Sequence, residues 1–248
     1  MSKRFAEFTE KGYASLIRTV REGYRFEPFG TRESRPHVLW RHDVDLSVHR
    51  ALRLAEIERG EEVSSTFFFL LHSEFYNLLE RGIMSRVRKI AALGHHIGLH
   101  FDSSFYQNGP GLRAIERRLA GERRLLEDVV GKRVRAFSLH DPKPAIVRLL
   151  SLDRIAGMIN VYGPAIRTQY EYCSDSNGYW RHSAPADLVA PARHQRLHVL
   201  THPEWWVPVA MSPWRRMQRC VSGRAEFVVR FYNRALARDR RHNVGAPR

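Results

Sequence analysis

Acidic residues and histidines stand at the ends of several short apolar runs of the sequence. The segment Arg41-His42-Asp43-Val44-Asp45 directly follows the apolar run Val38-Leu39-Trp40. The same arrangement recurs further along the chain, at His100, Asp102, His140, Asp175 and His202. Carboxylates and imidazoles are common ligands of divalent cations and common general acids and bases. These residues therefore predict a metal site or a proton-transfer site, provided that the fold brings the ends of the runs together.

Strand-like runs alternate with amphipathic, helix-like segments over most of the chain. Strands are expected at 38–40, 65–71, 97–101, 134–139, 158–161, 170–173 and 198–201, and helices over 47–59, 76–93, 112–130, 145–152 and 214–240. Repeated alternation of this kind favours a parallel sheet or barrel, whose active sites lie at the carboxyl ends of the strands. The acidic residues and histidines above all fall at or just beyond such ends.

The length and the absence of a linker or internal repeat predict a single domain over residues 1–248. Its barrel core is expected at 38–206, followed by a closing helix over 207–240 and a disordered tail at 241–248. Residues 1–10 and 239–248 are expected to be dispensable.

Composition limits the partners. The chain carries 41 basic and 26 acidic residues, a formal charge of +15, which is compatible with a polyanionic partner. The arginines are scattered along expected helices, however, and no nucleic-acid-binding motif accompanies them, so no nucleic-acid partner is expected. The longest apolar run, at 66–71, is too short to span a membrane, which takes about 20 residues. Two distant cysteines and an N-terminus without an apolar segment predict a cytoplasmic protein.

Six motifs together resemble those of polysaccharide deacetylases of the NodB-homology, carbohydrate esterase family 4 type, in the branch whose first motif reads His-Asp-Val-Asp. The resemblance covers about residues 38–206 and its motifs occur in family order: 41–45, 65–68, 94–100, 137–140, 174–180 and 200–206. It implies a distorted (β/α) barrel, in agreement with the alternation of strands and helices. It also implies a divalent metal ion, with zinc expected, and hydrolysis of an acetyl group on a sugar or a glycan precursor. The scattered arginines keep a nucleotide-sugar open as a further substrate.

The resemblance implies a role for each matching residue. Asp43 corresponds to the catalytic base, Asp45 and His100 to metal ligands, and His202 to the acid that protonates the leaving group. Arg41 and Asp175 are expected to orient these groups. N-acetyl groups, and so the carbon–nitrogen bond of an amide, are the expected target in preference to O-acetyl groups.

The sequence departs from the family pattern at the third metal ligand. The family places a histidine four residues after the one that corresponds to His100, and Ser104 stands there in this chain. His140 and Asp102 are better placed, and the sequence leaves the choice between them open. Trp180, Trp205 and Trp206 are expected to form part of the surface that binds substrate. The incomplete metal motif keeps a second hypothesis open, a weakly catalytic barrel that binds a carbohydrate or polyanion without turnover.

Overall fold

The computed structural model describes residues 5–106, 111–141, 146, 151–180, 182–189 and 194–245. The helices are α1 (Glu10–Gly23), α2 (Val48–Gly60), α3 (Arg81–Ala92), α4 (Leu112–Val130), α5 (Pro164–Gln169), α6 (Pro185–Val189) and α7 (Pro213–Arg238), with short 3₁₀ turns η2 (Ser103–Phe105), η4 (Ser176–Gly178) and η5 (Pro203–Trp205). The strands are β1 (Arg25–Phe26), β2 (His37–Val44), β3 (Thr66–Leu70), β4 (His96–Asp102), β5 (Ala136–His140), β6 (Arg154–Ile155), β7 (Met158–Asn160), β8 (Glu171–Ser174) and β9 (Arg196–Thr201).

One curled sheet joins these strands in the order β6-β7-β5-β4-β3-β2-β9-β8, with the short β1 paired to β2. All the strand pairs are parallel except the β6–β7 hairpin. The sheet remains open, since no strand pair in the described residues joins β6 or β7 to β8. The expected α/β class and barrel-like parallel sheet are confirmed, in the form of an incomplete barrel.

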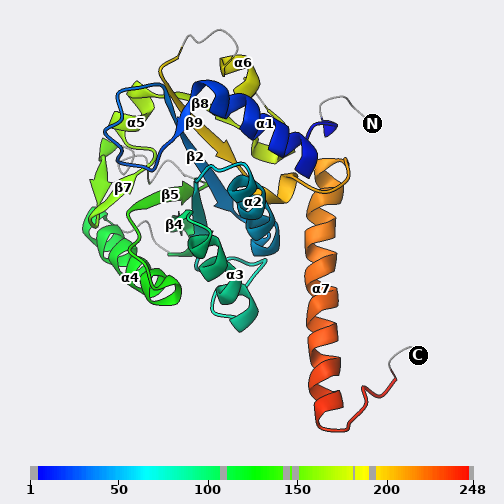
Figure 1. Cartoon of the computed structure of the whole chain (residues 1–248). Coiled ribbons are helices and arrows are strands. Elements are labelled where there is room, and N and C mark those ends of the chain that lie inside the picture. The colour runs from blue at the N-terminus through cyan, green and yellow to red at the C-terminus, as the bar shows by residue number, and fades with distance from the viewer. Residues whose placement is uncertain are drawn as a thin grey trace.

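Helices cover the outer face of the sheet (Figure 1). One core cluster lies between α2, α3, α4 and the outward side chains of β3, β4 and β5, such as Phe69 and Leu99. A smaller cluster that contains Leu39 and Phe68 fills the inner face. Because side chains alternate along a strand, Arg41 and Asp43 follow Leu39 on the inner face, whereas His42 points outward.

The N-terminal segment is part of the core, contrary to the expectation that residues 1–10 are dispensable. Phe8 is fully buried, with its ring centroid 4.6 Å from that of Trp206. Glu10 at the start of α1 forms ion pairs with Arg50 and Arg53 of α2, both at 2.9 Å. Helix α1 is amphipathic and covers β2 and β9, so the core extends beyond residues 38–206 on this side.

The predicted elements agree with the observed ones in type, with shifted bounds. The helix expected at 76–93 begins only at Arg81, because Tyr76 instead places its hydroxyl between the Val44 carbonyl and the Leu70 N–H. The helix expected at 145–152 lies mostly outside the described residues. The C-terminal helix is present as α7, but its second half extends away from the body (Figure 1), so it does not close the barrel. No helix in the described part of the chain is long and apolar enough to cross a membrane.

Candidate metal centre and active site

Parallel pairing brings the predicted site residues to one edge of the sheet. Asp43 lies near the end of β2, and His100 and His140 lie at or near the ends of β4 and β5. Asp175 follows β8 and His202 follows β9 directly. Since β8, β9, β2, β3, β4 and β5 are consecutive neighbours in the sheet, segments more than 150 residues apart in sequence meet at this edge.

Asp45, His100 and His140 form a compact cluster of candidate metal ligands. Asp45 Oδ1 lies 3.2 Å from His100 Nε2 and 3.5 Å from His140 Nδ1, and the two ring nitrogens are 3.2 Å apart. Four-coordinate zinc with bonds of about 2.0–2.1 Å places its ligand atoms roughly 3.3 Å apart. The three donor atoms therefore already have the mutual spacing of a zinc site.

The hydrogen bonds around His100 also favour a cation. Ser138 Oγ donates its proton to Asp43 Oδ1 at 3.2 Å, so it accepts the 2.6 Å hydrogen bond from His100 Nδ1. His100 then directs its Nε2 toward Asp45 Oδ1 at 3.2 Å, and in the neutral form of the ring this nitrogen would carry a lone pair. Two lone pairs that face each other at this distance repel unless a positive charge lies between them. The donor set thus fits a divalent cation, and Ser138 fixes the tautomer that would bind it.

Asp45 is charged in this environment. Burial opposes its ionisation, but the neighbouring His100 and His140 outweigh burial and hold the pKa of Asp45 well below its usual value. The pKa of His140 is raised, first by its contact with Asp45 and against the effect of burial. The site therefore offers a carboxylate ligand over the whole neutral range.

Asp43 lies beside the cluster and is held by two polar neighbours. Its Oδ2 lies 3.4 Å from Arg41 Nη2 and 4.0 Å from His100 Nε2, while Oδ1 accepts the Ser138 hydrogen bond. Arg41 is fully buried and also donates to the Tyr162 hydroxyl at 2.7 Å. Arg41 and Ser138 together fix the orientation of the Asp43 carboxylate.

His202 lies on the other side of the cluster. Its Nδ1 is 2.7 Å from Asp175 Oδ1, and its Nε2 is 3.8 Å from Asp45 Oδ2. Asp175 is fully buried and also accepts hydrogen bonds from the His202 backbone N–H at 3.0 Å and from Trp206 Nε1 at 2.9 Å. Burial disfavours the charged ring, but Asp175 outweighs it and raises the pKa of His202 to about 10. The ring is thus a fixed, protonated group with Nε2 directed into the site.

His42 belongs to a separate network on the outer face of the sheet. Its Nε2 is 2.7 Å from the fully buried carboxylate of Glu58 on α2, and its Nδ1 is 2.7 Å from Thr201 Oγ1. Glu58 also accepts hydrogen bonds from Ser65 at 2.6 Å and from Tyr13. This network anchors α1 and α2 to the sheet and does not reach the metal cluster.

A second buried carboxyl group, Glu122 of α4, lies near the same edge. Tyr106 donates its hydroxyl proton to Glu122 Oε1 at 2.5 Å, and His72 Nε2 is 3.4 Å from the same oxygen. Burial is the main cause that raises the pKa of Glu122 to about 7.

The structure separates the two candidates for the third ligand. Asp102 accepts hydrogen bonds from the Ser104 backbone and hydroxyl, both at 2.7 Å, and thereby caps η2. His140 instead lies with Asp45 and His100, and these three form a possible metal group. His96 has the family spacing to His100 but stands at the opposite end of β4, where it lines a cavity of about 520 Å³.

The burial of Trp206 contradicts its predicted role in substrate binding. Trp206 is only 1% exposed and packs against Phe8 and Tyr13, so its ring has no face open to a substrate. Its role is to hold Asp175 through the indole N–H. Trp180 and Trp205 are half-buried beside it and keep part of their surface accessible.

Three polar residues of the site were not anticipated from the sequence. Ser138 donates a hydrogen bond to Asp43, and Tyr162 accepts one from Arg41. Glu204 is a fully buried carboxyl group without a hydrogen-bond partner in the described residues. Burial and then Asp45 raise the pKa of Glu204 well above its usual value. Ser138 and Glu204 do lie within recognised motifs, two residues before His140 and two after His202, and this proximity was the available signal.

No protein-family model matches the chain, and no curated protein matches it in sequence. A carbohydrate esterase family 4 pseudoenzyme of Bacillus anthracis matches in structure at 17% identity and a TM-score of 0.47, over 82% of this chain and 63% of the pseudoenzyme. The chain thus spans less than two thirds of the length of that protein.

Two further structures match over most of both chains. A family 4 carbohydrate esterase of Bacillus anthracis has 15% identity and a TM-score of 0.45, over 86% of this chain and 85% of its own. A polysaccharide deacetylase of Bacillus cereus has 13% identity and a TM-score of 0.45, over 76% of this chain and 88% of its own. In fold, the chain is similar to these carbohydrate esterase family 4 and polysaccharide deacetylase structures.

Proposed function

We propose that the chain is a metal-dependent hydrolase that removes an acetyl group from the nitrogen of a sugar or glycan precursor. The observation that carries the proposal is the cluster of Asp45, His100 and His140, with Asp43 on one side and His202 on the other. The six sequence motifs in family order support an acetylated sugar as the substrate class.

Asp45, His100 and His140 would hold the metal, with zinc as the expected ion. When bound, the metal would lower the pKa of a water molecule and polarise the acetyl carbonyl group. The nitrogen ligands favour zinc or a related transition metal over magnesium or calcium, which bind through oxygen.

Asp43 is the proposed general base. The water oxygen adds to the carbonyl carbon, and Asp43 accepts the proton that the water loses. The ion pair with Arg41 and the hydrogen bond from Ser138 hold the carboxylate in place before the substrate arrives. Little reorganisation is then needed when the proton moves.

His202 is the proposed general acid. When the carbon–nitrogen bond breaks, the sugar nitrogen takes a proton from His202 Nε2 and leaves as an amine, and acetate is the other product. Asp175 holds His202 Nδ1, so that Nε2 remains directed toward the site. Trp206 in turn fixes Asp175.

The test measures zinc per chain and acetate release from N-acetylated oligosaccharides for the wild type and three variants. Asp45→Ala is expected to lose both the metal and the activity. Asp43→Asn is expected to keep the metal and lose turnover. Asp102→Asn is the matched control, because it alters a strand-end carboxylate outside the cluster, and it is expected to keep both.

A wild-type chain that binds no zinc after reconstitution contradicts the proposal. So does Asp45→Ala protein that keeps the full metal content. A chain that binds zinc at the cluster and binds acetylated oligosaccharides, but releases no acetate from any of them, would show the non-catalytic barrel instead.

A further inference from the structure

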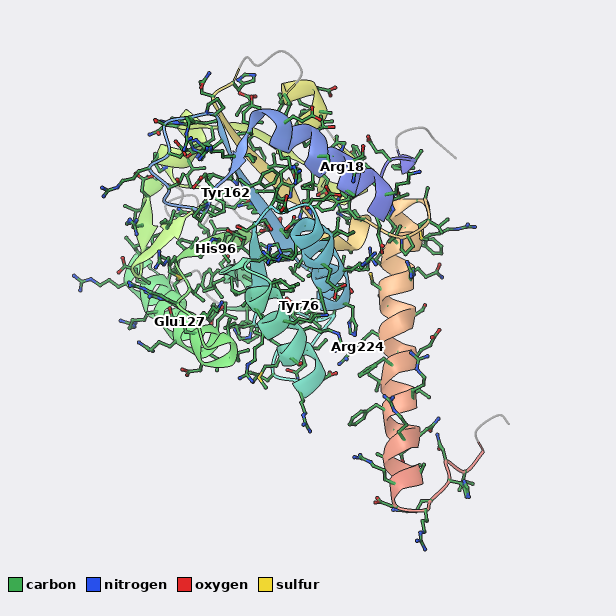
Figure 2. All side chains as sticks on the ribbon, in the orientation of Figure 1. Arg18, Tyr76, His96, Glu127, Tyr162 and Arg224 are labelled. Atoms are coloured by element: carbon green, nitrogen blue, oxygen red, sulfur yellow. The ribbon has the colours of Figure 1, made fainter. Side chains whose placement is uncertain are left out.

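Helix α7 is a long helix that the rest of the described chain barely covers. Of its 26 residues only Arg216 is buried. Its first half is attached to the body through Arg216, which donates to the Gly178 and Phe5 carbonyl groups. A bidentate ion pair between Arg224 and Glu80, at 2.6 and 3.1 Å, is a second attachment. Figure 2 shows Arg224 on the side of α7 that faces the body.

The second half of α7 has no such attachment. In Figure 1 it extends beyond the barrel with no helix or strand beside it. Within the described residues, the hydrogen bonds and ion pairs of 228–238 stay within α7 and the short tail that follows it. A helical segment of this length without a packing partner is only marginally stable in water, which indicates that another surface covers it.

The uncovered side of α7 carries an apolar stripe. Trp214, Val221 and Val228 follow each other at intervals of seven residues, and Ala225 and Tyr232 lie four residues after the two valines. At 100° per residue these side chains fall on one face of the helix. Their exposure is high for apolar residues, at 62% for Trp214, 48% for Val228 and 56% for Tyr232.

Arginines dominate the polar side of α7 and the short tail that follows it. Residues 213–241 contain nine arginines against two acidic residues, Glu226 and Asp239. Arg219, Arg230, Arg234 and Arg238 lie on the side opposite the stripe, which is the side that Arg216 attaches to the body in the first half of the helix. Neither Arg234 nor Arg238 has an ion-pair partner among the described residues.

We propose that α7 is a membrane-surface anchor, whose apolar stripe enters the outer part of an anionic lipid bilayer while its arginines bind the lipid phosphates. An amphipathic helix with a cationic polar face and aromatic residues on its apolar face lies in the plane of such an interface. The long arginine side chains can reach the phosphates while the helix axis lies deeper. This contact places the helix on the bilayer and does not require it to span the membrane.

Charge favours a lipid bilayer over a second copy of the chain as the surface that covers the stripe. Two copies of α7 in contact would bring seven arginines from each close together, in a protein whose formal charge is already +15. An anionic surface is attracted by the same charges. Self-association through the stripe is therefore the competing outcome of the test.

The experiment is flotation of the full-length protein with vesicles of equal parts phosphatidylglycerol and phosphatidylcholine, and with vesicles of phosphatidylcholine alone. The wild type is expected to float with the anionic vesicles and to bind the neutral ones at least tenfold more weakly. Val228→Asp is expected to weaken binding to anionic vesicles at least tenfold. The charge variant Arg234→Glu/Arg238→Glu is expected to do the same and to abolish the preference for anionic lipid.

Leu125→Asp is the matched control, because Leu125 on α4 is 43% exposed and the same charge is introduced outside α7. It is expected to float like the wild type. Circular dichroism in the absence of vesicles checks that each variant retains its helix content. Absence of flotation by the wild type, or unchanged flotation of Val228→Asp, overturns the proposal. A wild-type dimer in sedimentation that Val228→Asp converts to a monomer, without vesicle binding by either protein, would assign the stripe to a second copy.

Discussion

Replacement of Ser138 by alanine tests the arrangement of the metal centre without removing a proposed ligand. The Ser138 hydroxyl is buried between His100 Nδ1, at 2.6 Å, and Asp43 Oδ1, at 3.2 Å. Alanine removes both hydrogen bonds and leaves the His100 ring free to adopt the other tautomer. We therefore expect Ser138→Ala to bind zinc more weakly than the wild type while all three ligands remain.

The magnitude follows from the contacts that are lost. A hydrogen bond between neutral partners is worth about 0.5–1.5 kcal/mol, and each 1.4 kcal/mol is a factor of about ten in affinity. Loss of a partner that orients a ligating histidine commonly weakens metal binding about 10-fold to 100-fold. For one hydrogen bond to His100, the lower part of that range, about tenfold, is expected. The metal-free protein should also lose about 1–3 kcal/mol of stability, because a buried N–H is left without an acceptor.

Zinc affinity is measured by competition with a chromophoric chelator, and stability by urea unfolding of the metal-free protein. Ser65→Ala is the matched control. Ser65 is also buried and donates to the carboxylate of Glu58 at 2.6 Å, but on the outer face of the sheet, away from the cluster. Ser65→Ala should lower stability by a similar amount and leave zinc affinity unchanged. Wild-type zinc affinity in Ser138→Ala, or an equal loss of affinity in both variants, would refute the reasoning.

Three further outcomes are expected. Asp175→Asn should reduce kcat about 100-fold or more on any acetylated substrate that the wild type hydrolyses, because Asp175 holds the proposed acid His202. It should leave zinc content unchanged, because Asp175 lies outside the group of proposed ligands. Glu58→Ala should lower the free energy of unfolding by about 3–5 kcal/mol in urea, because it leaves several buried donors without their acceptor. Glu122 has a pKa of about 7 in the folded chain against 4.5 as the ordinary value, so the folded state binds more protons between these pH values. The stability that Glu122 contributes is therefore full below pH 4.5 and falls by about 3 kcal/mol as the pH rises to 7. The free energy of unfolding of Glu122→Gln, measured in urea at several pH values across this range, should not show this decline.

The sequence contains enough local information to predict the elements and the edge of the sheet that carries the site. Apolar runs that end in Asp43, His100 or His202 form strands because β-branched and aromatic residues favour a strand and the amphipathic segments between them form helices. Strand-helix alternation then favours parallel pairing, and parallel strands end at a common edge. For this reason the candidate residues could be named before their contacts were known.

Local sequence does not say which face of a strand is covered or what lies beside its end. His42 and Asp43 are neighbours in sequence, yet only packing of α1 and α2 on the outer face assigns His42 to Glu58 and leaves Asp43 for the site. The same holds for Trp206, which the burial of Phe8 and Tyr13 turns into a core residue. Tyr13, Ile17 and Val20 of α1 have helical spacing in the sequence, but only their contacts show that this helix belongs to the core.

The sequence by itself thus determined the α/β class, the parallel pairing of the main strands, and the residue types available for metal binding and proton transfer, because these depend on periodicity and composition over short windows. Only the tertiary structure decided that His140 lies with Asp45 and His100 while Asp102 caps a turn, that Ser138 links His100 to Asp43, and that the stripe on α7 is left uncovered. Each of these depends on distances between segments far apart in the chain, and such distances are set by the packing of the whole fold.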